Sequence, residues 1–344
     1  MAAAAPDFMI KADDDPAPLP QAQTIVSPAQ LLTYRQIAWP SAFDFRLYVS
    51  LLCRPLYLSH KEQGELSQGA ARFILESQFA ALAPYPLHID EPYTFNEKMQ
   101  WYKLHYRNPL MTVCADKLRL REYVRDTLGT EASSKIFPSL LGTWERADDI
   151  DFAALPVSFV LKVNHGNAQN ILVRAKQDLD LKATRERLNT WLKPEHNHYY
   201  AALEWCYKDI KPAILCEEFL ELGHDLPDYK FFCFHGEPRL FYIAQNRFGP
   251  GGTQMDFYDL KGDHLPFTRL YPNAPVPPKK PQHLDRMLDI ARALARPFPF
   301  VRVDFFDTPQ GPLLGELTFY PGNGTEFFDP LDWDYRLGSL LTLS

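Results

Sequence analysis

Apolar residues recur at helical spacing in the first half of the chain. The stretch from about residue 29 to 87 is apolar with a helical pattern, and it predicts a helix over Ala70 to Leu82. Thr94 is followed three residues later by Glu97 and then by an apolar run, which is the signature of a capping box. This signature predicts a second helix over Thr94 to Tyr106.

A longer amphipathic pattern follows. Val113, Leu120, Val124 and Leu128 lie on one stripe of a helical wheel, so a helix is predicted over Val113 to Leu128. Two further helices are predicted, over Leu181 to Trp191 and over Pro281 to Arg296, where apolar residues again repeat at helical spacing.

After Pro156 the pattern changes to short, β-branched and aromatic runs that are typical of strands. Seven strands are predicted: Phe159–Asn164, Ile171–Arg174, Ala213–Phe219, Tyr229–Phe234, Arg239–Ala244, Phe300–Phe306 and Leu313–Phe319. The chain therefore combines helices with a strand-rich second half.

Composition narrows the class of protein. The chain has 344 residues, of which 46% are hydrophobic, enough for a core without disulfide bonds. Its 36 basic and 43 acidic residues give a net charge of -7, which argues against a nucleic acid partner. Residues 1–28 are rich in Ala, Pro, Asp and Gln and are predicted to be disordered. Five scattered cysteines, no signal peptide and no long apolar run indicate a cytoplasmic protein.

The last predicted hairpin brings two carboxylates together. If its strands pair about a turn centred near Gln310, Asp304 lies opposite Glu316 and Arg302 lies opposite Thr318. Opposed carboxylates repel each other and usually need a cation or a shared proton, and two hard oxygen ligands suit Mg²⁺. The alternative is a solvent-facing hairpin with incidental charges.

A second group of polar residues lies in FVLKVNHGNAQNILV. Lys162 and Asn164 alternate out of an apolar strand and precede a loop from His165 to Asn170. A strand lysine beside such a loop can hold a nucleotide phosphate while the loop amides cover it. A solvent-exposed edge lysine is the alternative.

A third group lies at the end of an apolar strand, at Glu217 and Glu218 followed by Phe219 and Leu220. Such a strand end can form an adenine slot, in which backbone groups read the base edge and apolar side chains enclose the ring. Asp228 and Lys230 share a face of the next predicted strand, where a surface ion pair is the alternative.

In this order, the motifs ADKLRLREYV, FVLKVNHG, EEFL, RVDFF and GELTFYPG resemble the ATP-grasp superfamily. The ending is similar to that of D-alanine–D-alanine ligases. The resemblance is closer to the teichuronopeptide-biosynthesis (TupA-like) branch, over about residues 92 to 340. It rests on the motifs TFNEKMQWYKLHYRNP, ADKLRLREYV, FVLKVNHG, DYKFFCFHGEP and FPFVRVDFF. The resemblance implies an α+β ATP-grasp fold in which a nucleotide is held between two α+β lobes.

The same resemblance implies a domain organisation. A helical extension at 29–90 would precede an ATP-grasp region at 91–344. Within that region, a lysine and loop lobe would span about 110–215, and a hinge and magnesium-binding lobe about 216–344.

Roles for individual residues also follow from the resemblance. Lys117, placed on a helix, and Lys162 would contact ATP phosphates, and Asn164 and the loop His165–Gly166–Asn167 would close over them. Glu217, Glu218, Phe219 and Leu220 would hold adenine, with Asp228 near the ribose and Lys230 near phosphate or acceptor. Asp304, Glu316 and Thr318 would bind Mg²⁺, and Arg302 would stabilise the transferred group. Two positions depart from the family pattern: Asn167–Ala168 replaces a second loop glycine, and Thr318 replaces an asparagine.

The implied reaction is an ATP- and Mg²⁺-dependent ligation of a carboxylate to an amine through an acyl phosphate. The expected partners are a uronic acid of a surface polysaccharide or its precursor, an amine such as an amino acid, and peripheral contact with membrane-bound polysaccharide machinery. One alternative is a glycosyltransferase, for which Asp-x-Asp triplets at 13–15, 149–151, 178–180 and 332–334 are weak support. A nucleotide-binding protein without ligase activity is another, and a kinase that stops at the phosphorylated product is a third. The aromatic residues around His198 to Tyr207 would either stack on sugar rings or pack in the core.

Overall fold

The computed structural model describes residues 66–166, 169–193, 196–197, 199, 202–220, 226–246, 249 and 251–343. The predicted disordered segment 1–28 lies outside the described residues. So do the part of the predicted helical extension before residue 66 and the loop residue Asn167.

Five of the described helices lie before the first strand, and three lie among or after the strands. They are α3 (Gln68–Leu82), α4 (Phe95–His105), α5 (Pro109–Ala115), α6 (Arg119–Leu128), α7 (Thr130–Ser134), α8 (Leu181–Trp191), α10 (Leu284–Ala295) and α11 (Asp332–Leu340). No helix among the described residues is both long enough and apolar enough to cross a membrane.

The strands form three sheets. The first has the order β1-β4-β2-β3, and its strands are β1 (Leu140–Trp144), β2 (Phe159–Val163), β3 (Asn170–Val173) and β4 (Ile214–Glu218). The second has the order β11-β10-β5-β6-β7-β8, and its strands are β5 (Asp228–Phe234), β6 (Glu237–Gln245), β7 (Gln254–Tyr258), β8 (His264–Leu265), β10 (Phe300–Thr308) and β11 (Gly311–Thr318). The third pairs β12 (Phe328–Asp329) with β9 (Thr268–Arg269).

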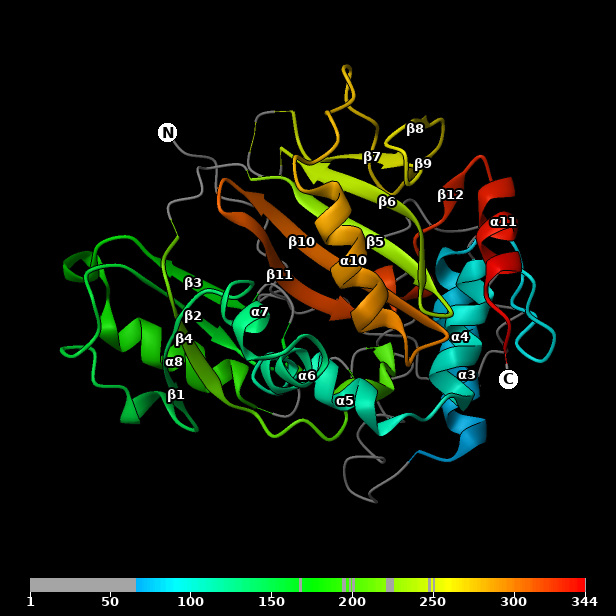
Figure 1. Cartoon of the computed structure of the whole chain (residues 1–344). Coiled ribbons are helices and arrows are strands. Elements are labelled where there is room, and N and C mark those ends of the chain that lie inside the picture. The colour runs from blue at the N-terminus through cyan, green and yellow to red at the C-terminus, as the bar shows by residue number, and fades with distance from the viewer. Residues whose placement is uncertain are drawn as a thin grey trace.

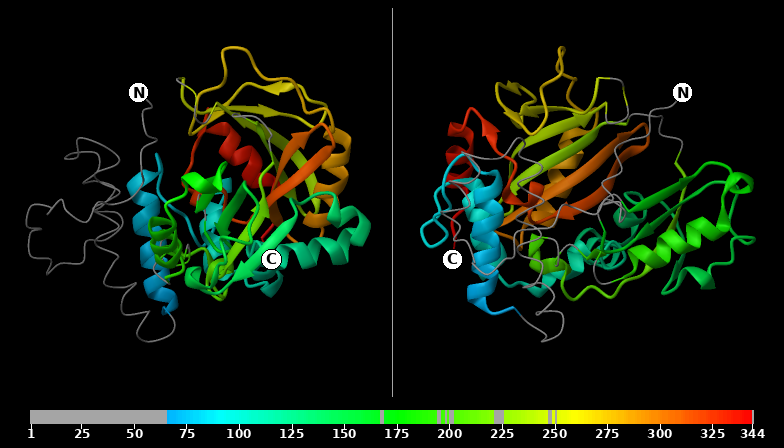
Figure 2. Two further views of the ribbon diagram at one scale, coloured as in Figure 1. Left: turned by 90° about the vertical axis from the view of Figure 1, so that its left-hand side faces the viewer. Right: turned by 180° about the vertical axis from the view of Figure 1, so that it is seen from behind.

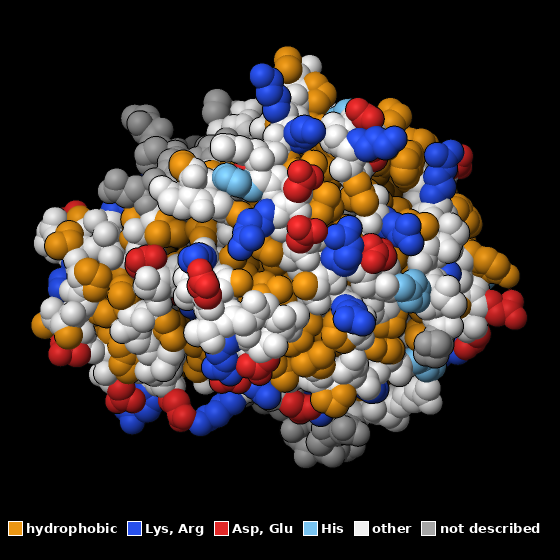
Figure 3. All heavy atoms as spheres, viewed as in Figure 1, with side chains coloured by type: hydrophobic (Ala, Val, Ile, Leu, Met, Phe, Trp, Pro, Cys, Tyr) orange, Lys and Arg blue, Asp and Glu red, His pale blue; other side chains and the backbone are white. Residues whose placement is uncertain are grey.

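The two larger sheets belong to two parts of the molecule that lie side by side (Figure 1). Helix α8 packs on the four-stranded sheet, where Leu188 joins a core with Phe159, Leu161 and Ile214. Helix α10 lies across one face of the six-stranded sheet, and α3, α4 and α11 gather at the end far from the four-stranded sheet (Figures 1 and 2). On the face that carries α10, basic and acidic side chains are intermixed (Figure 3).

Strand periodicity divides the six-stranded sheet into two unlike faces. In β10, Val301, Val303 and Phe305 pack in one core with Met287 and other α10 residues. Successive side chains of a strand alternate between faces, so Phe300, Arg302 and Asp304 lie on the opposite face. At one end of that face Phe300 packs in a second core with α4 and α11, while the charged residues occupy the other end.

Several predicted elements are confirmed within a few residues. Helix α8 has the predicted bounds, and α4 begins with the predicted capping box: the Thr94 side chain accepts from the Glu97 N–H, and the Glu97 carboxylate accepts from the Thr94 N–H. All seven predicted strands are present, whereas the strands β1, β7, β8, β9 and β12 and the helices α7 and α11 have no counterpart among the predicted elements.

The prediction of one helix over Val113 to Leu128 is wrong. The chain breaks at Asp116, whose Oδ1 accepts a hydrogen bond of 2.9 Å from the Leu118 N–H at the start of α6. The Lys117 N–H donates to the Asn164 carbonyl, 3.1 Å away, and so does not continue α5. Lys117 therefore lies in the turn between α5 and α6 and not on a helix.

The predicted hairpin register is confirmed, with Asp304 opposite Glu316 and Arg302 opposite Thr318. The turn is tighter than a symmetric one about Gln310, because Thr308 pairs with Gly311. A β-bulge at Gly315 adds the missing residue and restores the pairing beyond it.

Candidate functional site

A row of charged residues crosses three neighbouring strands of the six-stranded sheet. Asp304 on β10 lies opposite Glu316 on β11 and opposite Lys230 on β5. The Lys230 ammonium forms an ion pair with Asp304, and its Nζ lies 3.6 Å from an oxygen of Asp228. Asp304 is only 3% exposed, so this charge is compensated by protein partners and hardly by water.

Arg302 connects the same carboxylates. Its Nε and Nη2 donate to the two oxygens of Asp304 at 2.7 and 2.6 Å. Nη2 also reaches the Thr318 hydroxyl at 3.0 Å and a Glu316 oxygen at 3.5 Å. Burial works to raise the pKa of Asp304, but the charges of Arg302 and Lys230 hold it below the ordinary value.

The donor set of the hairpin fits a magnesium ion that is coordinated partly by the protein and partly by the phosphates of a nucleotide. It consists of two opposed carboxylates, Asp304 and Glu316, with the Thr318 hydroxyl next to them. No group of three or more acidic, cysteine or histidine ligands occurs among the described residues. This composition matches Mg²⁺, which takes one or two carboxylates together with substrate phosphates and water.

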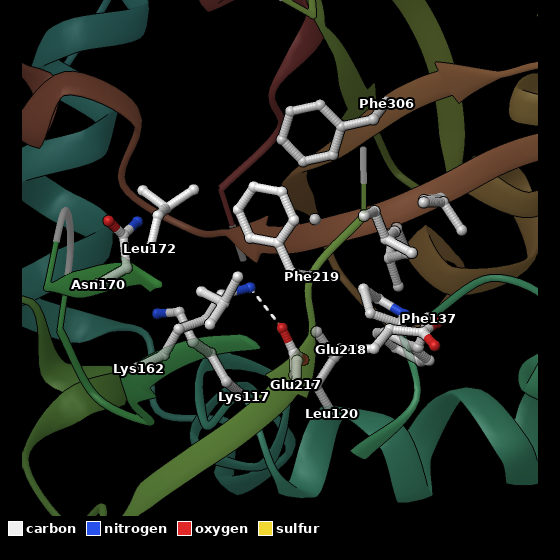
Figure 4. A pocket seen from close by; sticks show the side chains of 16 residues that line it. Lys117, Leu120, Phe137, Lys162, Asn170, Leu172, Glu217, Glu218, Phe219 and Phe306 are labelled. Carbon is white, nitrogen blue, oxygen red and sulfur yellow. Dashed lines mark hydrogen bonds and ion pairs between the residues drawn. The ribbon is translucent and has the colours of Figure 1, made fainter. Parts of the chain in front are cut away.

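A cavity of about 250 Å³ lies between the two large sheets. It is lined by residues of β2, β3 and β4, by the α5–α6 turn and by the hairpin β10–β11: Lys117, Leu120, Phe137, Pro138, Val160, Lys162, Asn170, Leu172, Glu217, Glu218, Phe219, Leu220, Phe306, Leu313, Leu314 and Gly315. In Figure 4 the rings of Phe219 and Phe306 lie next to each other, with the Lys162–Glu217 pair below them. A mainly apolar slot with charged groups at one side suits a flat base attached to phosphates.

Strand alternation explains how Lys162 and Glu217 reach the cavity. Phe159, Leu161 and Val163 of β2 face the core under α8, so Lys162 faces the other way. Glu217 accepts from Lys162 at 2.5 Å and from Arg121 at 2.6 Å. Burial works to raise the pKa of Glu217, but these two cations keep it below the ordinary value.

Lys117 connects the cavity to the hairpin. Its Nζ donates to the Gly166 carbonyl at 2.6 Å. Burial lowers the pKa of this ammonium group, while the charges of Glu316 and Glu217 act in the opposite direction. The Lys117 side chain therefore lies close enough to interact electrostatically with Glu316 of the hairpin and with Glu217 of the cavity.

Asn164 holds the α5–α6 turn in place. It is 1% exposed, donates to Asp116 and to the Lys211 carbonyl at 3.0 Å each, and accepts from the Ala213 N–H at 2.8 Å. These contacts fix the end of β2 against the turn that carries Lys117. The neighbouring His165 is fully buried.

The described residues among the predicted site residues thus fall into three groups. Lys117, Lys162 and residues 217–220 line the cavity, while Asp228, Lys230, Arg302, Asp304, Glu316 and Thr318 surround the hairpin. Asn164, His165 and Gly166 follow the end of β2 and are not among the residues that line the cavity.

The sequence reasoning missed several lining residues. Phe306 shares the face of Asp304 by strand alternation, so period two offered a signal for it. Phe137 and Pro138 lie in an irregular segment before β1, where no local pattern marks them.

Two of the Asp-x-Asp triplets that the structure describes contain an aspartate that caps a helix. Asp180 accepts from the Ala183 N–H at the start of α8 at 2.9 Å. Asp334 is fully buried and accepts from the backbone and side-chain amides of Asn96 at the start of α4. These two carboxylates are engaged in holding helices.

Comparison with known families agrees with this geometry. A family model described as TupA-like ATPgrasp matches residues 97–342, which is more than half of the chain. No curated protein sequence matches.

Solved structures show distant likeness only. D-alanine–D-alanine ligase from Bacillus anthracis, complexed with ATP, is 14% identical with a TM-score of 0.35, and the match covers 60% of this chain and 55% of that one. The enzyme of the same name from Helicobacter pylori is 14% identical with a TM-score of 0.37, covering 67% and 62%. L-amino acid ligase from Bacillus licheniformis is 13% identical with a TM-score of 0.40, covering 75% and 55%. The chain thus spans less than two thirds of the length of these proteins.

Proposed function

The chain belongs to the TupA-like ATP-grasp family, and on this premise we propose that it is an ATP- and Mg²⁺-dependent carboxylate–amine ligase. The carboxylate would be a uronic acid of a surface polysaccharide or its precursor, and the amine an amino acid or another primary amine. The reaction would pass through an acyl phosphate.

One observation carries this proposal. An apolar slot with two lysines, Lys117 and Lys162, lies between the sheets, and it adjoins a hairpin whose paired carboxylates Asp304 and Glu316 suit a metal bound to phosphates. A nucleotide whose base occupies the slot would direct its phosphates toward this hairpin. A protein that only binds a nucleobase has no need of a carboxylate pair next to the slot.

In the first step, a carboxylate oxygen of the substrate attacks the γ-phosphorus, and the bond to the ADP oxygen breaks. Lys117 and Lys162 hold phosphate oxygens, and Arg302 faces the negative charge that develops on the transferred group. Asp304 and Glu316 would hold the metal ion, which would neutralise part of the phosphate charge when bound. Arg302 and Lys230 keep Asp304 ionised and oriented before the nucleotide arrives.

In the second step, the amine nitrogen attacks the carbonyl carbon of the acyl phosphate. The C–N bond forms, the C–O bond to phosphate breaks, and phosphate leaves with the electron pair. A mixed anhydride hydrolyses readily, so the site has to exclude water from it until the amine arrives.

The test combines the protein with ATP, Mg²⁺, a set of uronic acids and a set of primary amines. We expect ADP release that depends on both organic substrates, with an amide product detected by mass spectrometry. Transfer of a sugar from a sugar nucleotide without ATP would contradict the proposal and favour a glycosyltransferase. Phosphorylated product without amide would indicate a kinase.

A further inference from the structure

Glu217 is a buried carboxylate that two cations share. Its side chain is 7% exposed and lies in the wall of the cavity, at the end of β4 (Figure 4). Oε1 accepts a hydrogen bond from Arg121 Nη2 at 2.6 Å, and Oε2 accepts one from Lys162 Nζ at 2.5 Å. The two ion pairs use separate oxygens, so the loss of one leaves the hydrogen bond of the other in place.

Arg121 is fixed by contacts other than Glu217. It lies on α6, and its side chain is 19% exposed. Nη2 also donates to the Pro138 carbonyl at 2.8 Å, and the guanidinium carbon lies 4.7 Å from the centre of the Phe137 ring, a cation–π contact. A movement of Arg121 away from Glu217 would break these contacts together.

Lys162 is held by fewer contacts. Its side chain is 30% exposed and lines the cavity, and Glu217 is its one hydrogen-bond partner within the described part of the chain. An ammonium group carries three N–H donors, so Lys162 can donate to a ligand in the cavity. Lys162 is therefore the partner of Glu217 that a phosphate can draw away, and Arg121 is the partner that stays.

Removal of Lys162 would be strongly unfavourable if Glu217 had no second cation. Burial works to raise the pKa of Glu217, but the charges of Lys162 and Arg121 hold it below the ordinary value, so the group is a carboxylate at neutral pH. Breaking a buried ion pair leaves an uncompensated charge. A cation that remains on the same carboxylate reduces this penalty.

We propose that Arg121 is a positioning residue for nucleotide binding, which neutralises Glu217 so that Lys162 can exchange this carboxylate for a phosphate of ATP. Arg121 is not among the residues that line the cavity, and it acts on the nucleotide through Glu217 and Lys162. The inference rests on the proposed function, in which Lys162 holds phosphate oxygens.

The experiment is a double-mutant cycle that is measured with two ligands. Isothermal titration calorimetry records the binding of the ATP analogue AMP-PNP with Mg²⁺, and of adenosine, which has the base and the ribose but no phosphate. We expect Arg121→Met to bind AMP-PNP roughly tenfold more weakly or worse, because release of Lys162 would then leave the Glu217 carboxylate without its ion pairs. Adenosine should bind as it does to the wild type.

Glu217→Gln is the second variant of the cycle. With a neutral side chain at this position Lys162 is no longer retained by a charge, so adding Arg121→Met to Glu217→Gln should change AMP-PNP affinity by less than about twofold. An equal effect of Arg121→Met in both backgrounds would overturn the proposal, because Arg121 would then act independently of Glu217. Equal loss of adenosine and AMP-PNP binding in Arg121→Met would also overturn it, since that result would show a general role in shaping the slot.

Two further variants test the role of the charge. Arg121→Lys keeps a cation at this position and should recover part of the AMP-PNP affinity that Arg121→Met loses. Arg125→Met, also on α6, removes an arginine whose ion pair with Asp126 is exposed, and it should leave the affinity for both ligands unchanged.

The binding cycle and the ligase assay separate this proposal from the proposed function. Coupling between Arg121 and Glu217 in a protein that binds AMP-PNP but forms no amide would support the role of Arg121 and contradict the ligase function. Amide formation by the wild type, with no coupling in the cycle, would overturn the role of Arg121 alone. A wild type that binds neither AMP-PNP nor adenosine would overturn both.

Discussion

Asp304 and Glu316 face each other across β10 and β11 because β11 carries a bulge at Gly315. A two-residue turn followed by regular pairing would place Gly315 opposite Asp304 and would turn Glu316 to the face covered by α10. The bulge also leaves Gly315 in the wall of the cavity. Gly315 therefore sets the pairing of Asp304 with Glu316 and also forms part of the cavity wall.

The first prediction concerns this glycine. A Cβ at position 315 would lie 3.4 Å from the Asp304 carbonyl and from the Phe306 ring, so Gly315→Val would crowd the slot. We expect weaker ATP binding, by about 1–3 kcal/mol, measured by isothermal titration calorimetry. Gly69→Val, where a Cβ meets nothing within 4 Å, is the control and should bind ATP as wild type does.

The second prediction concerns the metal. ATP with Mg²⁺ should raise the melting temperature of the wild type, because a ligand that binds only the folded state stabilises it. Asp304→Asn combined with Glu316→Gln should remove most of the part of this increase that depends on Mg²⁺. The comparison uses only the rise in melting temperature that Mg²⁺ addition causes, because the variant also leaves Arg302 and Lys230 without their charged partner.

The control for the metal prediction replaces two exposed carboxylates, Asp126→Asn with Glu131→Gln, whose side chains are 68% and 86% exposed. This control should keep the full increment. An unchanged magnesium response in the hairpin variant would rule out the hairpin as the metal site.

The third prediction concerns Lys162. Its ammonium contacts Glu217 in the cavity, and Lys162→Met removes a charged partner from any phosphate bound there. A hydrogen bond to a charged group contributes about 1.5–3 kcal/mol, so ATP affinity should fall by roughly tenfold or more. Equilibrium binding of a fluorescent ATP analogue measures this, with Lys182→Met on the exposed face of α8 as the matched control. Equal affinity in the two variants would place the phosphates elsewhere.

The fourth prediction concerns the pH dependence of stability. Burial works to raise the pKa of Glu97, but backbone N–H groups of Thr94, His88 and Tyr93 hold it below the ordinary 4.5. A depressed folded-state pKa means that the stabilisation is complete above about 4.5 and is lost as pH falls through the folded-state value.

We therefore expect Glu97→Gln to lower the free energy of unfolding by about 1–3 kcal/mol at neutral pH. The difference from wild type should shrink below about pH 4.5 in urea titrations, while the exposed Glu122→Gln should differ little at any pH. A difference that grows on acidification would contradict this assignment.

Sequence alone was sufficient where the determining contacts are local. The capping box of Thr94 and Glu97 depends on residues three positions apart, and α8 has the bounds that its apolar spacing predicts. The hairpin pairing of Asp304 with Glu316 also follows from a short connection, although the bulge that produces it was not foreseen. Residue type and spacing within about 15 positions carry this information, because each contact closes a short loop of chain.

Tertiary structure decided where distant segments meet. The apparent helix over 113–128 is broken because Asp116 and Lys117 bond to Asn164, and no local pattern announces that contact. The motif around Lys103 does not indicate that this lysine is buried and donates to the Asn323 carbonyl. The sequence by itself determined which elements form and which of their faces are polar. Only the packing of the two sheets decided which polar faces meet, because burial and pairing of charges depend on contacts between residues far apart in the chain.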